Sequence, residues 1–370
     1  MNFKPAENKI SNNFCNGLDL FLNNASRSPI PLSHKKIIEE YLVTWSHANH
    51  DPYYFNFTHA DKLKQQIGLF VNSDANQIAI GTNVADGFSK LLHGLDWDKT
   101  DEIILVDDDY PSVTLPFQTK TPPTIRWVKP INGITSVESI QKILTPNVRA
   151  IALSWINYTT GQVNHISDIS EFCKKNNILL FVDATQALGV LPIDLSTIQI
   201  DYFTASLYKW CFCPQGIAIS IFSSTLLNKL TPIGSGVFSQ HDRQLRHFPN
   251  EPSSSARKFE YGNLNILGIM LAHETFRWFN DIGINLIHTT LKRLAQGILE
   301  MLVLKSYRFP VRYSVQHASS ILSFIHPDAD TFMNQLQNHG GNATYRHGMV
   351  RLSPGIYQND TTIIKLRDIL

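Results

Sequence analysis

The segment from Ile178 to Trp210 constrains the fold more than any other part of the chain. It contains two short apolar runs, Ile178–Val182 and Asp201–Ala205, and polar side chains follow each run. Apolar runs of this length are typical of strands that are buried on both faces of a parallel sheet. Asp183 follows the first run and Lys209 follows the second. We therefore expect two neighbouring strands to place a carboxylate and an amine at one edge of a sheet.

A carboxylate and an amine at the same sheet edge are the two groups that pyridoxal phosphate requires. The amine bonds to the cofactor's aldehyde, and the acid keeps the ring nitrogen protonated so that the ring accepts electrons. An Asp and a Lys at strand ends are also common as ordinary surface residues. The pair alone therefore only suggests the cofactor, and the rest of the site has to come from elsewhere in the chain.

The composition is that of a globular protein without a strong electrostatic partner. Of 370 residues, 43% are hydrophobic and 17% are charged, and the formal net charge is +1. No basic block favours nucleic acid or an anionic membrane. No apolar run approaches the roughly 18 residues of a membrane span, and residues 1–10 lack the apolar core of a signal peptide. We expect a cytoplasmic protein with neither nucleic-acid nor membrane partners.

The four cysteines are too few for a disulfide framework in a chain of this length. Cys211 and Cys213 follow Lys209 closely and resemble half of a metal site. No second cysteine pair or suitably spaced histidine pair accompanies them. We expect buried structural thiols and no metal.

A strand followed by a turn and a helix has the pattern of a phosphate site. Gln77–Gly81 is predicted to be a strand, and Thr82 and Asn83 then open a helix. Free backbone amides and the positive end of the helix dipole attract anions at such a place. Thr82 or Asn83 acting only as the helix N-cap explains the pattern as well, and the two roles are compatible.

Two further loops follow predicted strands. Tyr110 follows Asp101–Val106, and its ring would suit the face of a flat cofactor, although a tyrosine of the rim or core is an equal alternative. Asn157 follows Arg149–Ser154 and is a candidate ligand contact or a residue that stabilises a turn. After this strand, the alternation of strands and helices continues, which predicts right-handed crossovers and a mostly parallel sheet. Ligands bind such sheets beyond the carboxyl ends of the strands.

The predicted fold is α/β, with a mostly parallel sheet in a large domain and a small C-terminal α+β domain. We expect residues 1–264 to form an N-terminal arm and the large cofactor-binding domain. Residues 265–370 are expected to form a long connecting helix and the small domain. Locally, Thr135 and Glu138 have the spacing of a capping box, which predicts a helix that begins there and ends before Pro146.

Together these segments resemble the class V aminotransferase superfamily of fold-type I pyridoxal-phosphate enzymes, which includes cysteine desulfurases, kynureninase and isopenicillin N epimerase. The resemblance extends from Leu22 to the final helix. Its most specific part is the set Asp183, Gln186, Ser206 and Lys209. The other matching segments are the arm at Asn24, the Tyr110-Pro-Ser segment, the Asn157-Tyr-Thr-Thr-Gly-Gln loop, the Phe259-Glu-Tyr-Gly-Asn263 loop and the Arg351-Leu-Ser segment.

The resemblance implies a role for each of these residues. Lys209 would bind pyridoxal 5'-phosphate and act as general base at the substrate's α-carbon, and Asp183 would hold the ring nitrogen. Arg351 would bind an amino acid's α-carboxylate through two parallel bonds, with a surface arginine as the alternative, and Asn24 and Asn157 would also approach the substrate. The implied cofactor-binding set is Thr82, Asn83, Tyr110, Asn157, Asp183, Gln186, Ser206, Tyr208, Lys209 and Asn263.

The family homodimer is also implied, because the loop that ends at Asn263 resembles the family loop that completes the partner's phosphate site. Asn263 stands where the family usually has threonine. The implied reaction is cleavage at the β-carbon of an α-amino acid or transamination. No cysteine follows Cys213, which argues against a desulfurase that forms a persulfide on its own cysteine. A nicotinamide enzyme is disfavoured because no G-x-G-x-x-G segment follows a strand, and a catalytically silent relative that acts as a binding or scaffold subunit remains an alternative.

Overall fold

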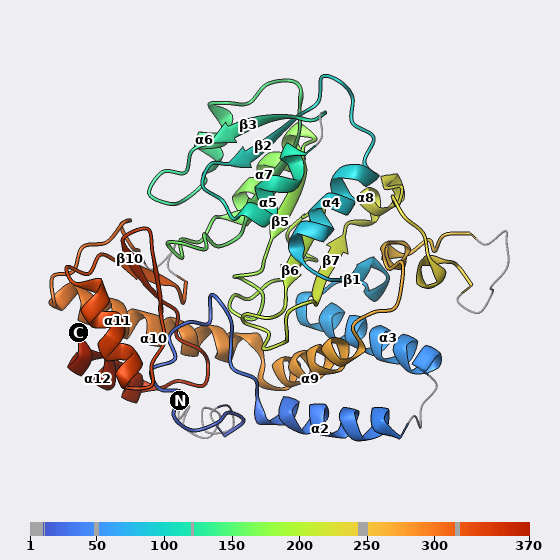
Figure 1. Cartoon of the computed structure of the whole chain (residues 1–370). Helices are drawn as coiled ribbons and strands as arrows, with labels where there is room; N and C mark the ends of the chain where they lie inside the picture. Colours follow the sequence, from blue (N-terminus) through green and yellow to red (C-terminus); the bar gives the residue numbers. More distant parts are fainter. Residues whose placement is uncertain (1–9, 11, 48–51, 120–121, 243–250, 315–318) are drawn as a thin grey trace.

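The computed structural model describes residues 10, 12–47, 52–119, 122–242, 251–314 and 319–370. Within these residues the chain forms a large sheet of seven strands and a small sheet of three (Figure 1). The large sheet has the order β1-β7-β6-β5-β4-β2-β3. Its strands are β1 (Ile78–Gly81), β2 (Glu102–Val106), β3 (Thr124–Val128), β4 (Val148–Ser154), β5 (Leu179–Asp183), β6 (Tyr202–Ser206) and β7 (Ala218–Phe222).

The central strands run parallel, as the apolar runs predict. β5 pairs in parallel with β4 and with β6, so their carboxyl ends meet at one edge. β7 is the exception, because it returns antiparallel to β6 and pairs antiparallel with β1. The chain turns back after β6 without an intervening helix, and a short connection of this kind suits an antiparallel neighbour. The predicted α/β fold with a mostly parallel sheet is confirmed.

Helices cover both faces of the large sheet because side chains of each strand alternate between the faces. In β5, Leu180 and Val182 belong to one apolar core and Phe181 belongs to the other. The first core takes in α3 (Pro52–Val71), α7 (Ile166–Asn176) and α9 (Ile266–Ile282). The second takes in α4 (Val84–Gly94), α5 (Pro111–Gln118) and α8 (Ser224–Lys229). The remaining helices of this part are α2 (Leu32–Ser46), α6 (Val137–Gln141), η1 (Ala75–Gln77), η2 (Val237–Ser239) and η3 (Ala256–Phe259).

The helix predicted to begin at Thr135 is shorter and is capped differently. The reciprocal capping bonds join Ser136 and Ser139, and α6 ends at Gln141. The predicted capping pair of Thr135 and Glu138 is therefore wrong by one position. The Ser136 hydroxyl accepts from the backbone amide of Ser139, and the Ser139 hydroxyl accepts from that of Ser136. Serine can therefore take either position of a capping box.

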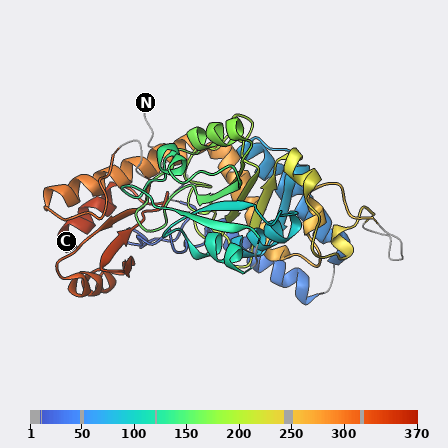
Figure 2. The same cartoon turned by 90° about the horizontal axis from the view of Figure 1, so that it is seen from above.

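The small sheet has the antiparallel order β8-β10-β9, formed by β8 (Leu322–Phe324), β9 (Thr344–Arg346) and β10 (Met349–Leu352). It packs with α10 (Ile284–Leu304), α11 (Ala329–Asn338) and α12 (Asp360–Ile369) around a third apolar core. Figure 2 shows this sheet at one end of an elongated molecule. The first and third apolar cores are joined by α10, because its Ile287 belongs to the first core and its Ile298 belongs to the third. The boundary between the large and small domains at residues 264 and 265 stays a prediction.

The N-terminal arm joins the two parts of the molecule. Phe21 and Asn23 form parallel bridges with Asn342 and Ser353 of the C-terminal part. Leu22 is fully buried in the core of the small sheet. The arm thereby brings residues near position 24 close to β10. Within the described residues, none of the helices combines the length and the apolar content that a membrane crossing needs.

Candidate active site

Lys209 lies in the loop after β6 and is buried, with 5% of its surface exposed. Its Nζ lies 5.1 Å from the centre of the Tyr110 ring and 5.6 Å from that of Tyr208. Burial, opposed by the charge of Asp183 and aided by that of Arg351, lowers the pKa of Lys209 to about 8. Within the described residues no carboxylate forms an ion pair with this amine. The buried amine is therefore partly neutral near pH 8.

Asp183 ends β5, beside β6, and is buried. Its Oδ1 accepts from the backbone amide of Thr185 at 2.8 Å and from the Thr185 hydroxyl at 2.5 Å. Its Oδ2 accepts no hydrogen bond from a described residue. Burial raises the pKa of Asp183, while Thr185 and the charge of Lys209 act against the rise. One carboxylate oxygen is thus fixed and the other is available to a ligand.

Gln186 and Ser206 lie next to this acid. The Gln186 Nε2 donates to the carbonyl of Ala25 in the arm at 3.0 Å, and its Oε1 accepts from Trp210 Nε1 at 2.7 Å. One hydrogen of the Gln186 amide remains for a ligand. The backbone amide of Ser206 donates to the Thr185 hydroxyl at 3.1 Å. Thr185 therefore links the ends of β5 and β6, a role that the sequence did not reveal.

Tyrosine rings surround the Lys209 amine. Tyr110 precedes α5 and meets Tyr158 edge to face, with 5.1 Å between ring centres. Burial raises the pKa of Tyr208 to about 12, helped by the neighbouring Tyr110 and Asp183. Tyr208 therefore stays protonated at neutral pH and keeps a hydroxyl donor. The cluster brings together two predicted residues, Tyr110 and Tyr208, and adds Tyr158.

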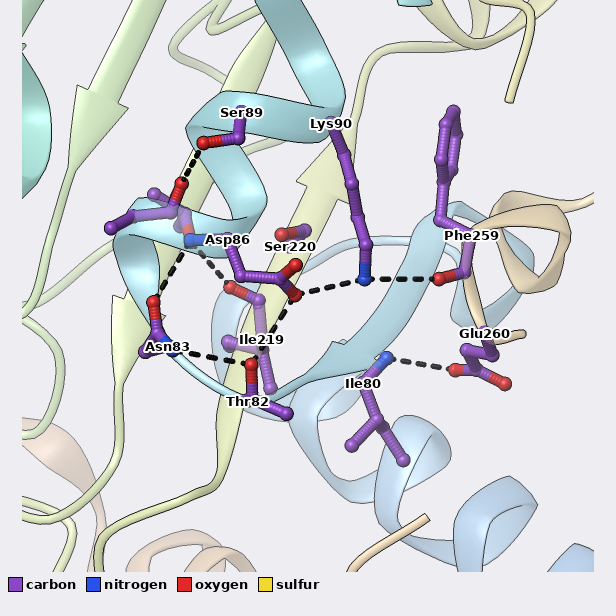
Figure 3. Close-up of polar contacts among 12 residues, drawn as sticks. Ile80, Thr82, Asn83, Asp86, Ser89, Lys90, Ile219, Ser220, Phe259 and Glu260 are labelled. Atoms are coloured by element: carbon purple, nitrogen blue, oxygen red, sulfur yellow. Dashed lines mark hydrogen bonds and ion pairs between the residues drawn. The ribbon is translucent and has the colours of Figure 1, made fainter. Parts of the chain in front are cut away.

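The predicted phosphate turn lies at the N-terminus of α4 (Figure 3). Asn83 is the N-cap, and its Oδ1 accepts from the backbone amide of Asp86 at 2.9 Å. Thr82 and Asn83 are exposed. The backbone amides of Val84 and Ala85 donate to no described residue, as expected for the first turn of a helix. The N-cap role of Asn83 is confirmed, and the free amides of the turn are suited to a phosphate. The phosphate contact of Thr82 and Asn83 stays a prediction.

Arg351 reaches from β10 toward the large domain. Its Nη1 donates to the carbonyl of Tyr158 at 2.6 Å, and its Nη2 donates to the Ser26 hydroxyl at 2.7 Å and to Thr344 at 3.3 Å. Its Nε is buried and has no hydrogen-bond partner among the described residues. Burial lowers the pKa of Arg351 to about 10, and the charge of Arg346 contributes. Within the described part of the chain, no acid forms an ion pair with Arg351.

Asn157 and Asn24 make bonds within the protein. The Asn157 Oδ1 accepts from the backbone amides of Thr159 and Thr160, both at 2.9 Å, which stabilises the turn. Asn24 is fully buried and donates to the carbonyl of Ser353 and to the Tyr357 hydroxyl, both at 3.0 Å. Asn157 therefore has the turn-stabilising role that the sequence left as an alternative. Contacts of Asn24 and Asn157 to a ligand stay predictions.

Asn263 forms no hydrogen bond to a described residue. It is exposed, and a Cβ added at the preceding Gly262 would meet no atom within 4 Å. The segment just before it is anchored, because Glu260 is buried and accepts from the backbone amide of Ile80 at 2.7 Å. The contact of Asn263 to a cofactor therefore stays a prediction that requires a second chain.

Asp109 is a partly buried acid beside Tyr110 that the sequence analysis did not single out. It accepts from the Ser154 amide at 2.7 Å, the Ser154 hydroxyl at 2.6 Å and the Tyr110 amide at 2.6 Å. Burial raises the pKa of Asp109 to about 6, against the effect of these bonds. The acid ties Tyr110 to the end of β4. Its position in a run of three aspartates, Asp107 to Asp109, hid it, because only the fold decides which of the three points inward.

Cys211 and Cys213 follow Lys209 and have the spacing of half a metal site. Cys211 and Cys213 are buried, and burial raises the pKa of both thiols. The Cys213 thiol donates to the carbonyl of Cys211 at 3.1 Å. Among the described residues, no group of three or more His, Cys, Asp or Glu side chains is arranged to hold a metal ion. The two thiols are structural.

A buried lysine and a buried acid at the carboxyl ends of neighbouring strands, with a helix N-terminus near them, define the class of protein. Such an arrangement is suited to a cofactor that combines an aldehyde, a basic ring and a phosphate. A family model described as aminotransferase class-V matches residues 20–340. The chain belongs to the class V aminotransferase family. This family uses pyridoxal phosphate, and the amine, the free Asp183 oxygen and the free amides of α4 fit that cofactor.

Relatives and solved structures support the same placement. A probable cysteine desulfurase of Borreliella burgdorferi is 26% identical over 358 residues, covering 88% of this chain and 82% of that protein. A complex of the cystine C–S lyase C-DES with its product cysteine persulfide has a TM-score of 0.85 at 19% identity, covering 94% of this chain and 96% of that chain. The cysteine desulfurase CsdA of Escherichia coli has a TM-score of 0.84 at 16% identity, covering 98% and 97%.

Proposed function

We propose that this protein is a pyridoxal-phosphate-dependent enzyme that removes the α-proton of an amino acid and acts as a β-carbon lyase or an aminotransferase. The observation that carries the proposal is the buried Lys209 amine, which no acid neutralises within the described residues and whose pKa is lowered to about 8. A general base works best when its pKa is near the working pH. The protein therefore has a base poised for proton transfer at neutral pH.

When bound, the cofactor would supply an electron-accepting ring. In this proposal the free Oδ2 of Asp183 would hold the ring nitrogen, and Tyr110 would cover the ring. Ser206, Tyr208 and the amides of α4 would hold the phosphate, and Gln186 would donate its remaining amide hydrogen to the ring's oxygen. Lys209 takes the proton from the α-carbon and returns it to the product or to the leaving group.

Arg351 is proposed to bind the α-carboxylate of the substrate. A largely buried guanidinium without an acidic partner is costly unless a ligand supplies the negative charge. The hydroxyl of Ser26, the carbonyl of Tyr158 and the hydroxyl of Thr344 fix the side chain in advance. Lysine has no planar pair of donors with which to replace it. The preformed site therefore favours α-amino acids over simple amines.

The choice between lyase and aminotransferase depends on relatives and on the cysteines. One relative of Schizosaccharomyces pombe is named an uncharacterized aminotransferase, 23% identical over 95% of this chain and 90% of that protein, whereas the C-DES protein is a cystine C–S lyase. The chain has no cysteine after Cys213; Cys173, Cys211 and Cys213 are buried, and the exposed Cys15 belongs to the N-terminal segment, not to a loop of the C-terminal third. We propose a lyase that does not pass sulfur through its own cysteines, with transamination as the second candidate.

A homodimer is part of the same proposal. Asn263 is exposed beyond a firmly anchored segment, and α2 leaves Leu42, Val43 and Trp45 between 51% and 62% exposed. Exposed apolar side chains grouped on one helix are typical of association surfaces. A second copy would cover the helix, and its Asn263 would complete the phosphate site.

The experiment is a product assay on purified protein supplied with pyridoxal phosphate. A panel of L-amino acids that includes cystine, cysteine, serine and alanine is incubated with and without a 2-oxoacid, and ammonia, sulfide and keto acids are measured. A lyase releases ammonia and a keto acid without an added acceptor, whereas an aminotransferase requires the acceptor and releases no ammonia. Lys209→Ala is the control. A colourless protein that gains no visible band with the cofactor would leave the silent binding or scaffold subunit in its place.

A further inference from the structure

An acidic side chain lies within the turn that is proposed to hold a phosphate. Asp86 belongs to the first turn of α4, two residues after the helix begins. Its Oδ2 accepts from the Thr82 hydroxyl at 3.3 Å, as Figure 3 shows. Two negative charges a few ångströms apart repel each other strongly where water is partly excluded. The turn therefore requires a compensating charge if it is to bind an anion.

Lys90 supplies that charge from one helical turn further along α4. Its Nζ donates to the same Oδ2 of Asp86 at 2.8 Å. The ion pair is partly buried, with 19% of the Lys90 side chain and 32% of the Asp86 side chain exposed. Lys90 also donates to the carbonyl of Phe259 at 3.4 Å (Figure 3). Its Nζ lies 5.0 Å from the centre of the Tyr261 ring. These contacts keep the ammonium group against Asp86.

The Thr82 hydroxyl and one hydrogen of the Asn83 side-chain amide are used within the protein. The Thr82 hydroxyl donates to Asp86, and the Asn83 Nδ2 donates to the Thr82 hydroxyl oxygen at 3.2 Å. The backbone amides of Val84 and Ala85 donate to no described residue and remain for a ligand. Backbone amides carry only partial charges, so the local charge balance has a large influence on anion affinity. The state of the Asp86 carboxylate therefore decides how well the turn attracts a phosphate.

We infer that Lys90 is a positioning residue of the phosphate site, which neutralises Asp86 and so allows the turn at Thr82 and Asn83 to accept an anion. The inference rests on the proposed function, because it concerns the phosphate of the proposed cofactor. It assigns Lys90 no contact with that phosphate. Lys90 acts by neutralising Asp86. Removing the Asp86 carboxylate as well should therefore restore the phosphate affinity that is lost when Lys90 is removed.

The test compares pyridoxal phosphate with pyridoxal, which lacks the phosphate but carries the same aldehyde for Lys209. Dissociation constants for both are measured by absorbance titration of the wild type, Lys90→Met, Asp86→Asn and the double variant. Lys90→Met is expected to weaken binding of pyridoxal phosphate by about tenfold or more and to leave pyridoxal unchanged. The double variant is expected to recover most of the affinity. Lys99→Met, which changes an exposed lysine beyond the other end of α4, is the matched control.

Thermal unfolding of the cofactor-free variants, with and without inorganic phosphate, gives a second readout, and phosphate is expected to raise the unfolding temperature of Lys90→Met less than that of the wild type. Asp86→Asn alone should bind pyridoxal phosphate as tightly as the wild type or more tightly, which keeps the test valid if Lys90→Met does not fold. Equal losses for the two ligands in Lys90→Met, a double variant that stays weak, or a weakened Asp86→Asn would each overturn the inference. A wild type that binds pyridoxal but gains nothing from the phosphate would also overturn it. A wild type that binds neither ligand would overturn the proposed function as well.

Discussion

Lys64 and Lys209 are equally buried, each with 5% of its surface exposed, yet their surroundings differ. Lys64 lies 2.7 Å from Glu260, whose carboxylate also accepts from the backbone amide of Ile80. Lys209 has two tyrosine rings beside it and no ion-pair partner among the described residues. Burial of an amine is costly unless a charge or hydrogen bond compensates it. The cost is offset by an ion pair at Lys64, whereas at Lys209 the charge of Asp183 offsets only part of it.

We propose that a missing ion-pair partner, more than burial, distinguishes the reactive lysine from the structural ones. A third buried lysine, Lys258, donates to the carbonyls of Leu227 and Leu230 at 2.7 Å each and closes the end of α8. Lys64 and Lys258 therefore hold parts of the fold together. Lys209 forms no hydrogen bond or ion pair with a described residue, and its lowered pKa reflects the cost of burying its charge.

The largest expected effect is on Lys209 itself. Lys209→Ala should lower turnover by about a thousandfold or more, because both the bond to the cofactor and the general base are removed. The free energy of unfolding of the cofactor-free protein should not fall as it would for a lysine in an ion pair. Steady-state kinetics and urea unfolding measure the two quantities. A Lys209→Ala variant with the turnover of the wild type would contradict the proposed difference between Lys209 and Lys64.

Asp183→Ala comes next. The variant would leave the protonated ring nitrogen of the bound cofactor without its acidic partner. Removing one partner of a buried ion pair costs roughly 3–5 kcal/mol, which would slow turnover on the order of a hundred- to a thousandfold. The loss is expected in kcat, since Asp183 is proposed to act on the ring and not on the substrate's carboxylate. Turnover near that of the wild type would contradict the role of this acid.

Lys64→Met tests the structural lysine. It should lower the free energy of unfolding by about 3–5 kcal/mol, because Glu260 would stay buried without its partner. Urea unfolding measures the loss, and Lys62→Met, an exposed lysine on the same helix, should change stability by less than about 0.5 kcal/mol. If Lys64→Met were as stable as its control, the ion pair would not explain why Lys64 can be buried.

The smallest effect is on the pH dependence of cofactor addition. Only the neutral amine attacks the aldehyde, and the pKa of Lys209 lies near 8. The rate at which pyridoxal phosphate joins the cofactor-free protein should rise about tenfold from pH 7 to pH 9 and then level off. Stopped-flow absorbance follows the reaction. A rate that is still rising steeply above pH 10 would mean that Lys209 titrates as an ordinary exposed lysine.

The site residues that follow strands are predictable from the sequence. Asp183 and Lys209 each come after an apolar run that forms a strand locally, and parallel pairing then places both at one edge. The turn at Thr82 and Asn83 is predictable for the same reason, since a cap residue precedes the helix. The fold class follows from the alternation of strands and helices. The antiparallel β7 is harder to predict, because an apolar run carries no sign of its direction.

The partners of these residues are not predictable in this way. Glu260 lies 260 − 64 = 196 positions from Lys64, and only the packing of α3 against β1 brings them together. The same holds for Arg351, which is fixed by Ser26, 351 − 26 = 325 positions away. A single sequence records which side chains are present but not which of them lack a partner after folding. The Lys90 and Asp86 pair is the opposite case, because its spacing of four on a helix is local.

The most direct test is the site of covalent attachment. The protein is incubated with pyridoxal phosphate, reduced with borohydride and digested, and the modified peptide is identified by mass spectrometry. The account predicts a visible absorption band that is lost on reduction, with the label on Lys209 and none on Lys64 or Lys258. A label spread over several lysines, or a protein without a band, would contradict the claim that Lys209 is the reactive amine of this fold.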